Sequence, residues 1–229
     1  MNSSKAVIVS LIFFVAVKTV ANAQVVSHSF TINENTIVYD KQTGKQLKYI
    51  DLKNIIRANN KVTFLETINE KGEIESLTYD AAGNGMDRRD TSLRTKPGEQ
   101  FPSFIVNTTG GSILTSKEFR GKFLVLNFNL FLKQPFTSPK ELFDFEKLMN
   151  DVRLKDKIVP ILFTHSDAEV IKEFTDQAKV SFAIVSEARN FMSRFLVTQF
   201  PSYVVINQDG TLLSYAEDLP ELKDLLNRL

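Results

Sequence analysis

The sequence predicts an α/β fold in which helices flank a central mixed sheet, with a small β-rich appendage at the amino-terminal side. The first observation is a near-continuous apolar run over 123–132, which is typical of a strand buried on both faces of a sheet. The second is a well-signed helix start at Ser138, directly after that run. The third is the alternation of strand and helix patterns after residue 96, which closes with a β-hairpin and a helix.

The composition fits one well-packed domain with an appendage, because 43% of the 229 residues are hydrophobic and 24% are charged. The formal net charge of +1 gives no indication of a nucleic-acid partner. The chain contains no cysteine. Thiol-disulfide exchange needs an attacking thiolate, and cysteine-dependent peroxidases need a thiol that forms a sulfenic acid. The composition therefore excludes both activities by a cysteine route, and it excludes structural disulfides.

Residues 1–23 have the pattern of a secretory signal peptide. Lys5 precedes an apolar run over 6–17, and Ala21-Asn22-Ala23 fits the small-x-small cleavage pattern. Lys18 ends the apolar run before it is long enough to span a membrane comfortably. We expect an exported protein, periplasmic or secreted, with no stable membrane span after cleavage. An uncleaved anchor is the alternative.

Residues 24–95 are predicted to form the β-rich appendage and a linker. The expected elements are a strand over Ser27–Val38, a turn over Asp40–Gly44, a helix over Leu52–Ala58, strands over Val62–Thr67 and Glu73–Tyr79, and a linker over 80–95 that packs on the next domain. This part of the chain shows no catalytic constellation.

Residues 96–229 are predicted to form the main domain, with the helices marked by capping boxes and apolar faces. Its first elements are a hairpin turning at Thr109–Gly111, a brief helix at Thr115–Glu118, the strand from Phe123, a helix from Pro139 to about Leu154, and a strand over Ile158–Thr164. A helix capped by Ser166 and Glu169 follows. The last elements are a strand over Phe182–Val185, a helix over Phe191–Phe195, a hairpin from Phe200 to Tyr215 turning at Asn207–Gly210, and a helix over Pro220–Leu229.

The junction between the strand from Phe123 and the following helix is the place where open α/β sheets put ligand-binding or catalytic groups. Asn127-Phe128, a short apolar link and Lys133-Gln134-Pro135-Phe136 before a helix resemble the active-site segment of the extracytoplasmic thioredoxin-like family. This family comprises thiol-disulfide oxidoreductases of the bacterial cell envelope, related to cytochrome-maturation thioredoxins and peroxiredoxins. Lys133 and Phe136 stand where the family has its two cysteines, and Pro135 stands at the intervening proline. The resemblance covers 98–229 and implies a thioredoxin-like fold.

Phe200-Pro201 precedes a buried strand and resembles the family's cis-proline position, so we expect a cis bond there. In the family this loop faces the cysteine pair and presents backbone groups to substrate peptides. The resemblance implies a binding groove formed by Lys133, Gln134, Pro135, Phe136, Phe200, Pro201 and Ser202.

Together with the absence of cysteine, this resemblance implies a binding module for a peptide or protein partner in the cell envelope, with no catalytic residue, cofactor or metal. Leu130, Phe131, Leu132 and Phe136 form either an apolar recognition patch in that groove or ordinary core.

Two alternatives stay open. One is an enzyme that reuses the pocket through Lys133, Thr137 or His165, and the other is an assembly module that acts through residues 24–95. His165 lies near Asp167, but no His-x-x-His spacing supports a metal site and no Gly-x-Ser-x-Gly elbow supports a serine hydrolase. We therefore interpret Lys133 and His165 as surface loop residues.

Overall fold

The computed structural model describes residues 32–59, 62–83, 90–150, 156–178 and 180–229. The predicted signal peptide, residues 1–23, lies outside the described residues. The chain from Asn33 to Leu229 forms one compact unit. In the described part of the chain, no helix combines the length and apolar character that crossing a membrane requires.

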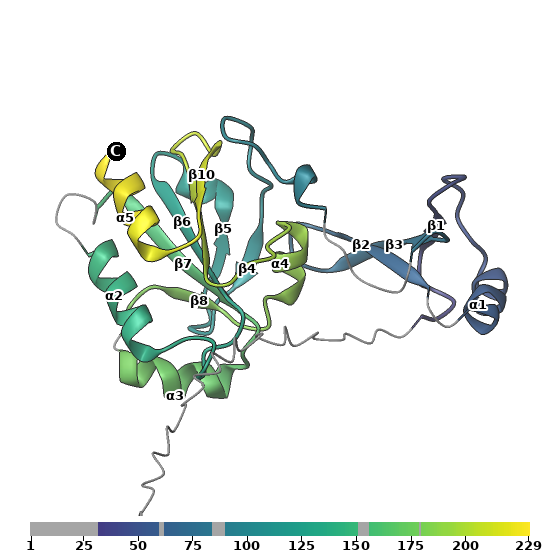
Figure 1. Cartoon of the computed structure of the whole chain (residues 1–229), viewed down its shortest axis with the longest axis horizontal. Helices are drawn as coiled ribbons and strands as arrows, with labels where there is room; N and C mark the ends of the chain where they lie inside the picture. Colours follow the sequence, from purple (N-terminus) through teal and green to yellow (C-terminus); the bar gives the residue numbers. More distant parts are fainter. Residues whose placement is uncertain (1–31, 60–61, 84–89, 151–155, 179) are drawn as a thin grey trace, which may run out of the picture. The chain divides into compact units, whose positions relative to one another are not determined.

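A five-stranded mixed sheet with β6 at its centre organises the main domain (Figure 1). The strand order is β10-β9-β6-β7-β8. β6 runs parallel to β7 and antiparallel to β9, β7 runs parallel to β8, and β10 closes the sheet antiparallel to β9. The strands are β6 (Phe123–Asn129), β7 (Ile158–Thr164), β8 (Ala183–Val185), β9 (Ser202–Ile206) and β10 (Leu212–Ala216).

Helices cover both faces of this sheet (Figure 1). The helices are α2 (Pro139–Met149), α3 (Ala168–Ala178), α4 (Arg189–Arg194) and α5 (Leu219–Asn227). Apolar side chains of α2, α3 and α5 pack on one face of the sheet, and those of α4 pack on the other. This arrangement is the thioredoxin-like fold that the sequence predicts.

The alternation of side chains along β6 explains why both sheet faces are apolar. Leu124, Leu126 and Phe128 point to the α4 face, whereas Val125 points to the opposite face. On the α4 face, aromatic rings contact one another at centroid distances of 4.9 to 6.3 Å. Much of the phenylalanine in the chain is therefore core, in Phe101, Phe104, Phe128, Phe163, Phe191 and Phe195.

The amino-terminal part of the described chain forms a second, three-stranded sheet in the order β1-β3-β2. Its elements are β1 (Val38–Asp40), α1 (Tyr49–Ala58), β2 (Thr63–Ile68) and β3 (Ile74–Asp80). The β2–β3 hairpin is fixed to α4 by polar contacts. Arg189 pairs with Glu66 at 3.4 Å, Asn190 donates to the Gly72 carbonyl at 2.8 Å, and Arg194 donates to the Ile68 carbonyl.

The segment that joins the two sheets is also held in place. It contains η1 (Thr91–Leu93), the hairpin of β4 (Ile105–Asn107) and β5 (Ile113–Thr115), and the short helix η2 (Ser116–Phe119). Arg94 donates to the Leu196 carbonyl at 2.7 Å, and its guanidinium lies over the Tyr215 ring at 5.5 Å. The end of the predicted linker therefore packs on the main domain.

The predicted strand over Ser27–Val38 is wrong for residues 32–37, and β1 starts at Val38. The reason is a local turn, in which the Asn33 side chain accepts from the Asn35 N–H at 2.9 Å. Asparagine often competes with strand pairing in this way. The helix predicted to reach Leu154 ends at Met149, with Asn150 as its C-cap.

Candidate functional site

The loop after β6 is anchored at its base and exposed at its tip. Leu132 is fully buried, and its N–H donates to the Ser166 hydroxyl at 2.8 Å. The N–H groups of Phe136 and Thr137 donate to the Lys133 carbonyl at 2.9 and 3.1 Å, which closes a turn over 133–136. Lys133, Gln134 and Pro135 are exposed, and the Gln134–Pro135 bond is cis.

The anchoring role of Ser166 corrects one prediction. Ser166 does not cap α3, because its hydroxyl is used by the loop. Asp167 caps the helix instead, with its carboxylate accepting from the Val170 N–H at 2.9 Å. Leu132 is core rather than part of a surface patch, so among the four apolar loop residues only Leu130, Phe131 and Phe136 are partly exposed.

The start of α2 follows the predicted capping box. The Ser138 hydroxyl accepts from the Glu141 N–H at 3.2 Å, and the Glu141 carboxylate accepts from the Ser138 N–H at 2.5 Å. Pro139 occupies the first turn, where its missing N–H costs nothing. These contacts fix where the loop ends and the helix begins.

A buried polar chain lies beneath the loop. Asn129 donates its side-chain amide to Asn127 Oδ1 at 2.7 Å, and the Thr137 hydroxyl donates to Asn129 Oδ1 at 3.0 Å. All three residues are at most 4% exposed. Their hydrogen bonds satisfy groups that would be costly to bury alone, and they tie the end of the loop to β6. Because the acceptor of the Thr137 proton is an amide oxygen rather than a base, this threonine is not an activated nucleophile.

Three side chains of the loop after β6 and the side chain of His165 form a cluster of aromatic rings and a cation. The Phe131 ring lies 5.3 Å from the Phe136 ring and 5.4 Å from the His165 ring, centroid to centroid. The Lys133 ammonium lies 5.2 Å from the Phe131 ring centroid, within the range of a cation–π contact. The structure thus brings Lys133, Phe136 and His165 around one ring. The enzyme alternative assumes that Lys133 and His165 share a pocket, whereas the central place of Phe131 was not expected. We name these four residues the loop cluster.

The predicted segment over 200–202 lies at the end of the sheet where β6 finishes. The Phe200–Pro201 bond is cis, as predicted. Ser202 begins β9 and lies opposite Phe128 of β6, one residue before the end of that strand. Phe200 packs against the core on the α4 face. The pairing of β6 with β9 therefore places Ser202 at the same end of the sheet as the start of the loop after β6.

Sequence reasoning missed Tyr203, the residue after Ser202. Its ring stacks on Phe145 of α2 at 5.7 Å and is 5% exposed. Burial raises the pKa of the Tyr203 phenol above its ordinary value, and the nearby Glu141 and Asp218 carboxylates raise the pKa further. Tyr203 therefore stays protonated to a higher pH than an exposed tyrosine does. The signal in the sequence was a tyrosine at a core-facing position of an otherwise aliphatic strand.

His165 is placed by its main chain, since its N–H donates to the Leu130 carbonyl at 3.0 Å. Within the described ranges, no group of three His, Cys, Asp or Glu residues is arranged to hold a metal ion. The loop cluster contributes no residue to a cavity that is lined by Leu124 and Arg120 in another part of the main domain.

Comparison with known proteins identifies a matching family and a thioredoxin-like relative. The family described as AhpC/TSA matches residues 97–214. The thioredoxin-like protein YneN of Bacillus subtilis (strain 168) is 23% identical over 117 residues, which cover 50% of this chain and 68% of YneN.

Two solved structures share the fold. The thioredoxin domain of a Bacteroides vulgatus thiol-disulfide oxidoreductase aligns with a TM-score of 0.51 and 14% identity, covering 58% of this chain and 96% of that domain. A thiol-disulfide oxidoreductase from Bacteroides fragilis aligns with a TM-score of 0.50 and 16% identity, covering 57% of this chain and 98% of that structure.

Proposed function

The chain belongs to the AhpC/TSA family, and because it contains no cysteine we propose that it is a binding module without thiol chemistry. Reduction of a disulfide or a peroxide by this family's fold requires a thiolate. Lys133 and Phe136 occupy the turn where that group would stand. The observation that carries the proposal is that the turn is nevertheless fixed by Ser138, Ser166 and Thr137.

The proposed ligand is an extended segment of a partner protein. The loop cluster supports this ligand class, because half-buried Phe131 and Phe136 offer apolar surface beside the exposed Lys133 ammonium. Such a surface suits a segment with an apolar side chain next to an acidic one. The Pro201 carbonyl, directly before β9, would supply an acceptor for pairing with extended chain.

We also propose that the protein is exported and meets its partner in the cell envelope. This proposal depends on the signal-like sequence over 1–23. Fractionation of cells that express the carboxyl-terminally tagged chain tests it. A tagged species that begins at Gln24 in the periplasm or medium is the expected result, and a tagged species retained in the cytosol at full length contradicts export.

The binding proposal is tested by co-purification with the tagged protein, comparing wild type with a Lys133→Ala/Phe136→Ala variant. The matched control is Lys140→Ala/Phe143→Ala, which removes the same two side-chain types from exposed positions on α2. We expect the partner to be lost only with the first variant. A partner retained by the first variant, or lost equally with both, contradicts binding at the loop cluster.

A candidate partner then allows a direct measurement. A synthetic segment of that partner should bind the purified protein with an affinity that falls about tenfold or more in Lys133→Ala/Phe136→Ala, as expected for removal of a central aromatic and a cation. Equal thermal unfolding of the two variants shows that the loss is one of binding rather than of folding.

A further inference from the structure

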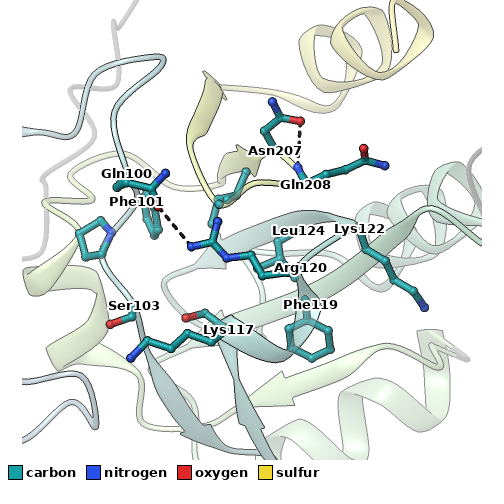
Figure 2. Close-up of a pocket in the computed structure, with 14 residues that line it drawn as sticks. Gln100, Phe101, Ser103, Lys117, Phe119, Arg120, Lys122, Leu124, Asn207 and Gln208 are labelled. Atoms are coloured by element: carbon teal, nitrogen blue, oxygen red, sulfur yellow. Dashed lines mark hydrogen bonds between the residues drawn. The ribbon is translucent and has the colours of Figure 1, made fainter.

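A cavity of about 230 Å³ opens at the amino-terminal end of β6 (Figure 2). It is lined by Leu124 near the start of β6, by Ile206 at the end of β9, and by the segment around Phe101. The loop cluster lies at the other end of β6. Leu124 and Asn129 are separated by about 17 Å along the strand at roughly 3.3 Å per residue. This cavity is thus distinct from the site proposed above.

The residues that line the cavity include three cations and no carboxylate. The cations are Lys117, Arg120 and Lys122. The exposed Asp209 in the β9–β10 turn lies close enough to Arg120 for the guanidinium to help lower the pKa of its carboxyl, so the positive charge of Arg120 is partly balanced. Figure 2 shows the Arg120 guanidinium in the middle of the group, whereas the Lys122 ammonium points away from it. Glu70 contacts two of the lining residues, because its carboxylate accepts from the Ser103 hydroxyl at 3.1 Å and lies 3.9 Å from the exposed Lys117 ammonium. Arg120 is therefore the charge that faces the cavity most directly.

The position of Arg120 depends on the β9–β10 turn. Its guanidinium donates to Gln100 Oε1 at 3.2 Å and packs directly on Gly210. Gly210 has a φ of +82°, and a Cβ added there would lie 2.2 Å from an Arg120 nitrogen. Among the described residues, this one hydrogen bond uses only one of the five N–H donors of the guanidinium. The remaining donors are available to a carboxylate or phosphate, which arginine binds bidentately.

The rest of the lining suits a ligand with a small apolar body. Phe101, Leu124 and Ile206 are at most 9% exposed and contribute apolar surface. Ser116 adds a hydroxyl, whereas the side-chain amide of Gln208 points away from Arg120 (Figure 2). We propose that this cavity binds a small organic anion, whose carboxylate or phosphate is held by Arg120 with help from Lys117 and whose apolar part lies on Phe101, Leu124 and Ile206. This inference is independent of the proposed peptide site.

The test is a titration of the isotope-labelled protein, followed by the chemical shifts of its backbone amides. The probes are phenyl phosphate, benzoate, inorganic phosphate and the neutral benzamide. We expect saturable shifts around 100–103, 116–122 and 207–210 for the two organic anions, with dissociation constants of about 1 mM or tighter. Equal binding of benzamide, equal binding of inorganic phosphate, or no saturable shift overturns the proposal.

Two variants locate the charge that matters. Arg120→Gln is expected to weaken the binding of phenyl phosphate by about tenfold or more, because hydrogen bonds to charged groups contribute strongly. Lys122→Gln removes the same charge from a side chain that points away, and we expect it to change the affinity by about twofold or less because exposed charges are screened. Equal effects of the two substitutions would mean that only net charge matters, which overturns the assignment to Arg120.

Discussion

Asn127 and Asn129 lie on one face of β6, at positions where a central strand normally carries apolar side chains. They are tolerated because each amide is hydrogen bonded, and the last member of the chain is the Thr137 hydroxyl. The loop after β6 is thus held by a buried contact that does not depend on the residues at its tip. The turn over 133–136 therefore does not depend on the side chains of Lys133 and Phe136.

The first prediction concerns this contact. Thr137→Val keeps the shape of the side chain but removes the donor to Asn129, so the free energy of unfolding should fall by about 1–3 kcal/mol. Urea denaturation measures the change. Thr137→Ser is the control, since it keeps the hydroxyl and should be less destabilising. A Val variant as stable as wild type would show that the hydrogen bond contributes nothing.

The second prediction concerns Tyr203 and high pH. Its pKa is raised in the folded protein, whereas the unfolded chain has the ordinary value near 10. Above about pH 10 the unfolded state loses the proton first, so the free energy of unfolding falls by about 1.4 kcal/mol per pH unit from this group alone. Tyr203→Phe should make that decline shallower in chemical denaturation between about pH 10 and 11. An identical slope in both proteins contradicts this role of burial.

At the scale of elements, the strongest local signals in the sequence were also the most accurate. The capping box at Ser138 placed the start of α2 correctly, and the apolar runs placed β6 and β7, because the residues that form these features act locally. Ser166 misled the prediction because its hydroxyl bonds to Leu132, which is distant in sequence. The contact of His165 with Phe131 could not be predicted for the same reason, since His165 reaches Phe131 only through the pairing of β6 with β7.

The attachment of the β2–β3 hairpin to α4 gives the third prediction. Gly72 has a φ of +79°, and a Cβ there would lie 2.7 Å from the Phe191 ring, whereas Gly44 has a φ of +67° and nothing within 4 Å. Gly44→Ala should cost about 1–2 kcal/mol from backbone strain alone. Gly72→Ala should cost about 1–3 kcal/mol more, because it also overpacks α4. Chemical denaturation compares the two, and equal losses would contradict the packing of the hairpin on α4.

This attachment bears on the hypothesis that residues 24–95 act as an assembly module. Deleting them would remove the partners of Arg189 and Asn190 and one of the two carbonyl partners of Arg194, so a loss of binding in the deletion would not identify an interface. Ile50, which is 57% exposed on α1, offers a cleaner test. Substituting Ile50 by Ser changes the appendage surface without touching α4.

At the scale of the whole molecule, the chain has the sheet of its family but no cysteine. The turn closed by the Phe136 N–H and the Lys133 carbonyl brings the Cα atoms of these residues within about 7 Å, and disulfides need about 4.4–6.8 Å. The fourth prediction is therefore that Lys133→Cys/Phe136→Cys forms an intramolecular disulfide under mild oxidation. Mass spectrometry detects it, and the two single variants are the controls.

The same double variant should catalyse the reduction of insulin by dithiothreitol, which neither wild type nor the single variants should do. A double variant that stays reduced or forms only intermolecular dimers would mean that more than the two cysteines was lost from the loop. In that case the geometry of the turn over 133–136, and not only the absence of cysteine, would argue against thiol chemistry and support the proposed binding role.

The two proposed binding sites lie at opposite ends of β6, the central strand of the sheet. Its carboxyl end carries the loop cluster and its amino end opens into the basic cavity, so one occupant leaves room for the other. On the two proposals above, the protein is an adaptor that holds a protein segment and a small metabolite at the same time. If either changes the affinity for the other, the reciprocal change must be equal in size. The concentration of a small anion would then set how firmly the partner is held, without competing for its surface.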